Sequence, residues 1–153
     1  MNKTQKGFTL IELLVVIAII GLLASVVLAS LNTARMRSRD ARRLADLRQL
    51  QTALELYFDS NNGYPNDSCN GWDIVCSPTS CTGVGTSNLG ELVTDGYMSS
   101  LPCDPVNSGA YQITFDPNLC AGGVCQSYCI RAVLEETGAL VGVSEDYPTC
   151  PTL

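Results

Sequence analysis

The sequence contains no histidine, and this absence removes several kinds of chemistry at once. Serine and cysteine nucleophiles that depend on a histidine base are excluded. No two cysteines have the Cys-x-x-Cys spacing of paired zinc knuckles, so structural zinc is disfavoured as well. No Walker-type glycine-lysine loop is present to hold a nucleotide phosphate. These absences together predict a protein that is not an enzyme and has no resident cofactor.

Basic residues are almost absent from the second part of the chain. Residues 1–48 carry a net charge of +5, whereas residues 49–153 contain only Arg131 against twelve acids. An acidic region of this kind is not suited to phosphate backbones, so we predict no direct contact with nucleic acid. The basic stretch from Arg35 to Arg48 also contains aspartates and regularly spaced leucines. We interpret it as the solvated face of an amphipathic helix.

Proline is absent before Pro65, and the preceding chain predicts one long helix from Phe8 to about Asn61. Its nineteen residues from Leu13 to Leu31 are uncharged, close to the roughly 20 that span a bilayer core. Later in the helix, apolar residues recur every three or four positions and form one stripe that must pack on something. The stripe consists of Leu44, Leu47, Leu50, Leu54, Tyr57 and Phe58.

The rest of the chain predicts a small sheet. Gly63 is suited to a left-handed helix cap, and the following proline forbids resumption of the helix. Alternating residues predict strands at 111–115, 127–134 and 139–143, the last two joined by a hairpin turn at 136–138. A short helix is expected at 88–94. The fold class is therefore α+β, a long N-terminal helix packed on a small antiparallel sheet, with a loop region rich in cysteine.

The cysteines are even in number and confined to the acidic part of the chain. Behind a membrane-targeting segment, this distribution predicts disulfides formed outside the cytoplasm. Eight cysteines allow 105 connectivities, so the pairing stays open. The residues concerned are Cys69, Cys76, Cys81, Cys103, Cys120, Cys125, Cys129 and Cys150.

Glu12 is the unusual residue of the N-terminal segment. It directly precedes the uncharged run and follows the apolar Leu10 and Ile11. A carboxylate at the centre of a membrane helix costs about 2.5–3.5 kcal/mol on insertion scales, and less near an end. A position with that cost usually has a partner.

The segment from Lys6 to Leu13, with sequence KGFTLIEL, resembles the class III signal of type IV prepilins and related pseudopilins. The resemblance combines a basic leader, a glycine, an aromatic residue, a carboxylate five residues after the glycine and an apolar helix. It extends to about Pro65. It implies cleavage between Gly7 and Phe8 by a prepilin peptidase, which would also methylate the new amino group of Phe8.

The resemblance also supplies a partner for Glu12, the Phe8 amine of a neighbouring subunit during filament assembly. Since both charges are costly when unpaired, such a pair mainly sets register. An intramolecular pair between Phe8 and Glu12, four residues apart on one helix, is the alternative, and both pairs can form at different stages. Many family members have a proline where this chain has Ala29, so unwinding of the helix is less expected here. A secretory signal peptide cut near Ala29 is disfavoured by the length of the apolar run.

The expected function is that of a subunit of a type IV pilus-like filament for adhesion, twitching motility or DNA uptake. The alternative within the family is a major or minor pseudopilin of a type II secretion system. An alternative of another class is a membrane-anchored binding module that never polymerises. The expected partners are the prepilin peptidase and methyltransferase, other copies and minor pilins, and the inner-membrane assembly machinery.

We expect the subunit to lie in the cytoplasmic membrane before assembly and in an extracellular filament afterwards. The expected division is a leader (1–7), an apolar anchoring and assembly half of the helix (8–31), a projecting amphipathic half (32–62) and a disulfide-bonded domain (63–153).

A calcium site is a further candidate. Asp104 lies in a connector where some major pseudopilins place calcium ligands, and oxygen-rich loops suit this cation.

Overall fold

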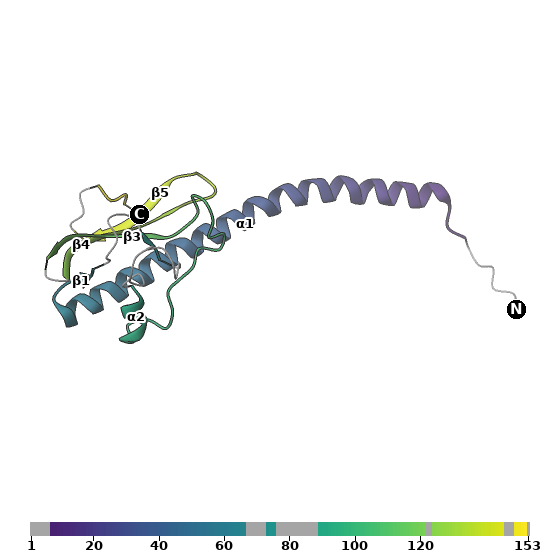
Figure 1. The fold of residues 1–153 in the computed structure, drawn as a ribbon. Helices are drawn as coiled ribbons and strands as arrows, with labels where there is room; N and C mark the ends of the chain where they lie inside the picture. Colours follow the sequence, from purple (N-terminus) through teal and green to yellow (C-terminus); the bar gives the residue numbers. More distant parts are fainter. Residues whose placement is uncertain (1–6, 67–72, 76–88, 122–123, 146–148, 153) are drawn as a thin grey trace, which may run out of the picture. The chain divides into compact units, whose positions relative to one another are not determined.

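The computed structural model describes residues 7–66, 73–75, 89–121, 124–145 and 149–152. The chain divides into two compact units, residues 1–36 and residues 37–153. The long helix α1 (Leu10–Asn61) runs through the boundary between them (Figure 1). Each unit is described by itself.

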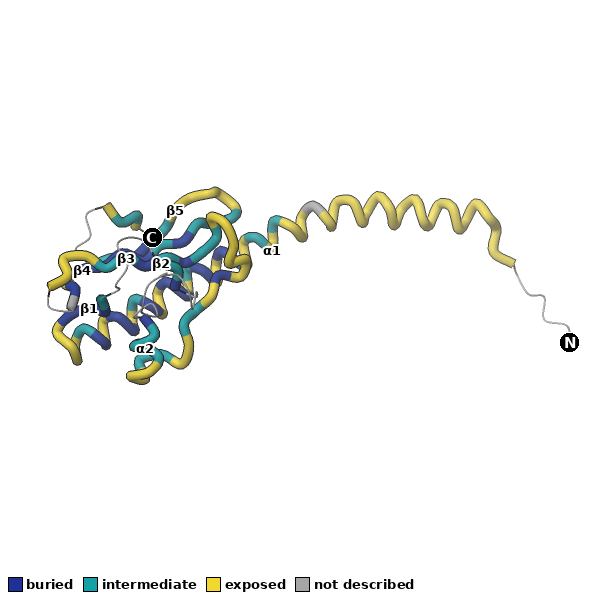
Figure 2. The backbone as a smooth tube through the Cα atoms, viewed as in Figure 1, coloured by how far each residue is buried: buried dark blue, intermediate teal, exposed yellow. Residues whose placement is uncertain are grey.

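The first unit is helical from Leu10 onward, and it buries almost none of its apolar surface. Its large apolar side chains are exposed, from 80% at Leu10 to 41% at Leu31, and Figure 2 draws this part of the chain almost entirely as exposed. By length and composition, α1 contains a segment able to cross a membrane. Because water-soluble proteins rarely leave a large continuous apolar surface uncovered, this unit requires lipid or other protein around it.

In the second unit the predicted apolar stripe of α1 is confirmed as the core. Leu47, Leu50 and Leu54 are completely buried, and Tyr57 is nearly so. Against them pack residues from the sheet and from α2 (Gly90–Thr94), including Leu92, which is also completely buried. The remaining stripe residues, at positions 44 and 58, are half-buried. A three- to four-residue period therefore located the packing face correctly.

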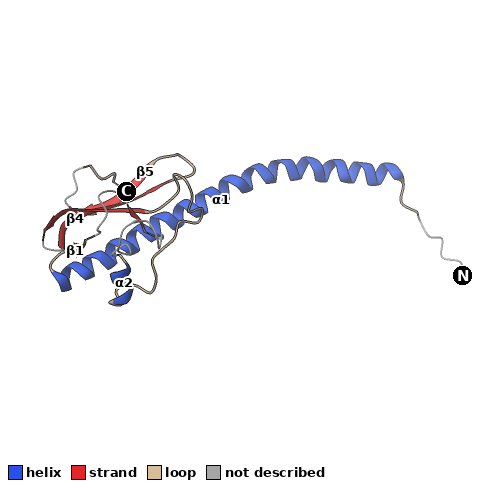
Figure 3. Ribbon diagram, in the orientation of Figure 1, coloured by secondary structure: helices blue, strands red, loops and turns tan. Residues whose placement is uncertain are grey.

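The sheet is antiparallel throughout, with strand order β1-β4-β3-β2 and β5 paired to β4. Figure 3 draws the strands in red and labels β1, β4 and β5. Its strands are β1 (Tyr64–Pro65), β2 (Asp73–Ile74), β3 (Thr114–Ala121), β4 (Val124–Val133) and β5 (Leu140–Glu145). The long strand β4 is the centre, because it pairs with three others. One face of β4 supplies Tyr128, Ile130 and Ala132 to the core. The predicted α+β fold is confirmed.

Two details differ from expectation. The left-handed residue that ends α1 is Asn62, with φ 56°, and not Gly63. Asparagine tolerates this conformation better than most residues, and the amide of Asn62 donates to the carbonyl of Phe58 at 2.7 Å. Strand β3 begins and ends later than predicted, since it continues through Pro117. That proline is tolerated because β2 pairs only with the start of β3, which leaves one side of Pro117 without a sheet partner among the described residues.

Candidate functional site

The predicted cleavage site lies just outside α1. Gly7, Phe8 and Thr9 are not helical, and all three are exposed, Phe8 to 76%. An added side chain at Gly7 would meet no atom within 4 Å. The bond between Gly7 and Phe8 is thus presented in open, non-helical backbone. Residues 1–6 of the leader lie outside the described part of the chain.

Glu12 is held by Thr9 at the first turn of α1. Its Oε2 atom accepts hydrogen bonds from the backbone amide of Thr9 at 2.9 Å and from the Thr9 hydroxyl at 2.6 Å. The amide of Glu12 in turn lies 3.3 Å from that hydroxyl. This reciprocal arrangement is a capping box, which satisfies amides that a helix start leaves without partners. Sequence reasoning missed it, although the spacing Thr9-x-x-Glu12 is its signature.

The capping box gives Glu12 a local role in the uncleaved chain. It places the carboxylate at the positive end of the helix dipole, where a negative charge is favoured. It engages Oε2, while no described hydrogen bond engages Oε1. The pairing of Glu12 with the Phe8 amine, within one subunit or between two, stays a prediction, because that amine exists only after cleavage.

The disulfide prediction is confirmed for the described cysteines. Cys120 pairs with Cys125 across β3 and β4, and Cys129 of β4 pairs with Cys150 near the C-terminus. Cys103 is also disulfide-bonded. The three remaining predicted residues, Cys69, Cys76 and Cys81, lie outside the described part of the chain.

The Cys129 to Cys150 bond holds the C-terminal segment against the sheet. Gly142 makes the close approach possible, because a Cβ atom there would lie 2.9 Å from the Pro151 carbonyl oxygen and 3.2 Å from Cys150 Sγ. Glycine is thus required at this position by space, not by backbone conformation.

The second unit contains a buried cluster of charges centred on Arg43, a side chain with no exposed surface. Two of its nitrogens donate to Asp104, at 2.6 Å and 2.8 Å. A third, Nη1, lies 2.7 Å from both Asp40 and Glu135. Its guanidinium also lies 5.4 Å from the ring centre of Tyr111. We call Arg39, Asp40, Arg43, Asp104 and Glu135 the Arg43 cluster.

The Arg43 cluster joins three segments that are distant in sequence. Arg39 makes a two-pronged bond to Glu135, and Asp40 accepts the backbone amides of Glu135 and Glu136 at 2.8 Å and 3.0 Å. Asp104 accepts the amides of its own connector, from Val106 at 2.8 Å. Helix α1, the connector at 101–107 and the turn between β4 and β5 are therefore tied together by charged hydrogen bonds.

The charges of the cluster stabilise one another. The hydrogen bond from Arg39 is the largest cause that lowers the pKa of Glu135. Burial raises this pKa and the bond from Arg43 lowers it further, and the overall result is about 2. Burial by itself raises the pKa of Asp104, but the bonds from Arg43 and from two backbone amides lower it overall. The bond to Asp104 is the largest cause that raises the pKa of Arg43. Arg43, Asp104 and Glu135 are therefore ionised at neutral pH.

This finding corrects the interpretation of the basic stretch as a solvated face. Arg43 is buried and Arg39 is half-buried. Both contact Glu135, which lies more than ninety residues later in the sequence. Helical periodicity could not show this, because the acids that neutralise the arginines come from other segments. The aspartates at positions 40 and 104 were visible as charges in the sequence, but their common partner was not.

The calcium candidate Asp104 lies inside this cluster. Both of its oxygens accept hydrogen bonds from Arg43, so a cation there would have to displace a guanidinium. Asn107 approaches only through its backbone amide, 3.2 Å from Asp104 Oδ1. Among the described residues no group of three acidic or cysteine side chains is placed to hold a metal ion. The calcium site at Asp104 stays a prediction.

Comparison with known families identifies the N-terminal segment. The family model of the prokaryotic N-terminal methylation motif matches residues 2–28. This range contains the predicted cleavage site, the capping box and most of the apolar run. No solved structure gives a significant match.

The curated relatives extend the match into the second unit. A type II secretion system core protein G of Pectobacterium carotovorum subsp. carotovorum is 35% identical over 101 residues, which cover 66% of this chain and 62% of the relative. That of Escherichia coli K12 is 35% identical over 101 residues, covering 66% of each chain. That of Aeromonas hydrophila is 34% identical over 104 residues, covering 68% of this chain and 69% of the relative.

The chain thus spans less than two thirds of the length of the first of these relatives. Of the two filament functions expected from the sequence, their names favour the secretion pseudopilin over the pilus subunit that was placed first.

Proposed function

Because the chain belongs to the family of the type II secretion system core protein G, we propose that it is a structural pseudopilin, a subunit that polymerises into a short helical filament of a secretion apparatus. The observation that carries the proposal is the N-terminal site. A non-helical Gly7–Phe8 bond, a capped Glu12 and an uncovered apolar helix follow one another without interruption. The role is structural, and no reaction is assigned to the chain.

Maturation is the first step of this proposal. A prepilin peptidase removes residues 1–7 and methylates the amino group of Phe8. The exposure of Gly7 and Phe8 supports access, since neither residue is part of a helix that would have to unwind.

The apolar part of α1 then serves twice. Residues 8–31 hold the subunit in the cytoplasmic membrane and afterwards pack against other copies. The small residues Gly21, Ala24 and Ser25 allow helices to approach closely. Residues 32–62 carry the helix into the domain formed by residues 63–153, and the disulfides there form outside the cytoplasm. The partners are other copies of the chain, minor pseudopilins and the inner-membrane assembly machinery.

Glu12 controls entry into the filament. The Thr9 hydroxyl and amide hold one carboxylate oxygen, which leaves the other for the Phe8 amine of a neighbour. Removing the carboxylate should therefore leave membrane insertion intact and block polymerisation.

The decisive test is the mass of the mature chain and the fate of a Glu12→Ala variant. The full chain is produced in a bacterium with a type II secretion apparatus whose own core protein G has been deleted. We expect both wild type and variant to lack residues 1–7 and to carry one methyl group on Phe8. We expect sheared filaments only from the wild type.

Each outcome separates one alternative. An intact Met1 terminus contradicts maturation. Processed, membrane-bound wild-type protein that never forms filaments would indicate a non-polymerising binding module. Normal filaments from Glu12→Ala would contradict the role of the carboxylate, with Glu12→Gln as the matched variant that keeps the size of the side chain.

A further inference from the structure

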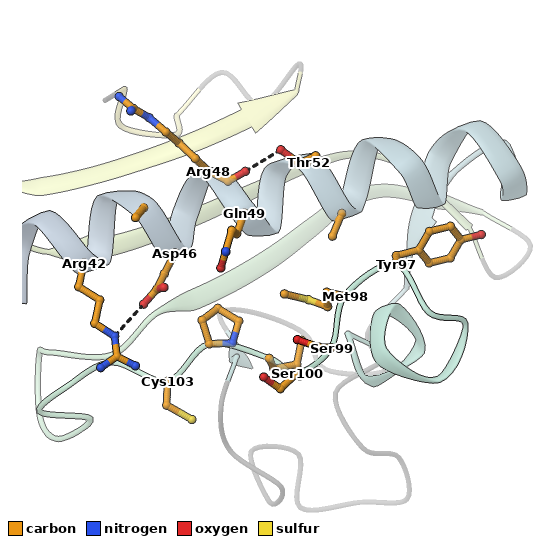
Figure 4. A pocket seen from close by; sticks show the side chains of 14 residues that line it. Arg42, Asp46, Arg48, Gln49, Thr52, Tyr97, Met98, Ser99, Ser100 and Cys103 are labelled. Carbon is orange, nitrogen blue, oxygen red and sulfur yellow. Dashed lines mark hydrogen bonds and ion pairs between the residues drawn. The ribbon is translucent and has the colours of Figure 1, made fainter.

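A groove in the second unit lies between α1 and the segment that leads from α2 into the connector. Residues 42–53 of α1 form one wall and residues 97–103 form the other, and the enclosed volume is about 880 Å³ (Figure 4). Arg42 and Arg48 belong to the helical wall, with Asp46 between them. We call this feature the α1 groove.

Asp46 is the unusual residue of the groove. Only 9% of it is exposed, and its Oδ2 atom is buried without a hydrogen-bond partner. Arg42 Nε, on a largely exposed side chain, forms an ion pair with this oxygen at 3.7 Å, which is too long for a hydrogen bond (Figure 4). Burial is the largest cause that raises the pKa of Asp46, which shows that the site disfavours the charge it carries.

The other buried aspartates of this unit are not left in this state. Asp40 receives two backbone amides and Arg43. Asp104 receives Arg43 twice, together with two amides. A buried carboxylate with an open oxygen is costly unless a donor reaches it. Among the residues that the structure describes, none donates a hydrogen bond to Asp46 Oδ2, so we expect a donor from a second subunit.

The chain itself carries suitable donors. Of the described arginines on α1, Arg35 and Arg48 are exposed and form no ion pair with another described residue. An arginine fork matches a carboxylate, and its long stem can reach into a groove. A divalent metal ion fits less well, since Asp46 is the only acidic side chain among the described residues that line the groove, and such ions require several oxygen ligands.

We propose that Asp46 in the α1 groove is a subunit-docking site, which receives Arg35 or Arg48 from a second copy of this chain. The inference rests on the proposed function, since polymerisation is what brings copies together. It adds a place of contact far along the sequence from Phe8 and Glu12. It also explains why a buried carboxylate oxygen has an ion pair but no hydrogen bond, because the hydrogen bond would form only in the assembled state.

The first experiment separates this role from a structural one. Asp46→Asn removes the charge and keeps the shape, and Asp59→Asn is the control at an exposed position of α1. Filaments are sheared from cells and quantified, and thermal unfolding of the full chain is followed in detergent. We expect roughly a tenfold or greater loss of filaments with Asp46→Asn. The thermal midpoint should be unchanged or raised by a few degrees.

Any other pattern overturns the inference. Normal filament yield with Asp46→Asn would show that no neighbour requires the carboxylate. A lowered thermal midpoint would show that Asp46 stabilises its own subunit. If the wild-type chain forms no filaments, the proposed function fails and this inference fails with it, whereas wild-type filaments with an unaffected Asp46→Asn variant overturn the inference alone.

The second experiment identifies the arginine. Arg35→Gln and Arg48→Gln are each made in the wild type and in Asp46→Asn. The arginine that docks should reduce filament yield in the wild type but cause no further loss in Asp46→Asn, since coupled residues are not additive. If each arginine variant reduces filament yield by the same factor in Asp46→Asn as in the wild type, neither arginine contacts Asp46.

Discussion

The two units of this chain treat hydrophobic and charged side chains in opposite ways. In the first, the apolar side chains are exposed, and the one acid among them is held by a neighbour three residues away. In the second, the apolar stripe is buried, and Arg43 is buried with it among acids from three segments. The second unit therefore buries its apolar core within itself. The first is complete only in lipid or among other copies.

The largest effect should come from removing the charge at the centre of the second unit. Arg43→Ala leaves Asp40, Asp104 and Glu135 buried without their common cation, and loss of one partner of a buried pair costs about 3–5 kcal/mol. Urea unfolding of the full chain in detergent measures this loss, since urea does not screen ion pairs as guanidinium does. Arg48→Ala, at an exposed position, should change stability by about 0.5 kcal/mol or less. A loss of that small size for Arg43→Ala would show that the cluster is not structural.

Acid should weaken the second unit while leaving the helix of the first in place. The pKa of Glu135 falls from 4.5 to about 2 on folding, chiefly through its bond to Arg39. Its contribution to stability is therefore complete above pH 4.5 and is lost as the pH falls toward 2. The lowered pKa of Asp104 acts in the same direction, whereas the raised pKa of Asp46 opposes it.

Unfolding in urea between pH 6 and pH 2 checks this expectation, with Glu135→Gln as the test variant and Glu145→Gln as the exposed control. Glu135→Gln should be less stable at pH 6 and should show a shallower decline toward acid than the wild type. An unchanged decline would remove Glu135 from the explanation.

The smallest effect should come from the capping box of the first unit. Thr9→Ala removes the hydroxyl that bonds Glu12, and loss of such a cap costs about 1 kcal/mol. Amide hydrogen exchange at the first turn of α1 should become faster, while the urea unfolding of the second unit stays the same. Thr9→Ser keeps the hydroxyl and should behave like the wild type. Equal protection in Thr9→Ala would show that the box does not hold the helix start.

Features that depend on local pattern could be predicted from the sequence. The spacing of Leu47, Leu50 and Leu54 located the packing face of α1, because a helix repeats every 3.6 residues whatever lies opposite. The hairpin turn was likewise predicted from a local signal, the glycine at position 138. Gly138 has a φ of 68°, a backbone conformation that favours glycine. The segment from Lys6 to Leu13 predicted the maturation site.

Features that depend on which segments meet could not be predicted. The predicted strand at 111–115 did not extend to Pro117, which β3 accommodates because β2 pairs only with the start of β3. The pairing of Cys129 with Cys150 joins residues that no spacing rule connects. The burial of Arg43 depends on Asp104 and Glu135 arriving from two other segments.

The sequence by itself determined the kind of subunit this is, because the N-terminal methylation motif, the apolar run and helix formation depend on residues that are neighbours along the chain. Only the tertiary structure decided which charges are satisfied. Coulomb attraction acts through space, and a carboxylate that appears solvated in sequence can be neutralised, as Asp104 is, or left open, as Asp46 is. Asp104 therefore belongs to the residues that hold this subunit together, whereas we propose that Asp46 contacts a neighbouring subunit.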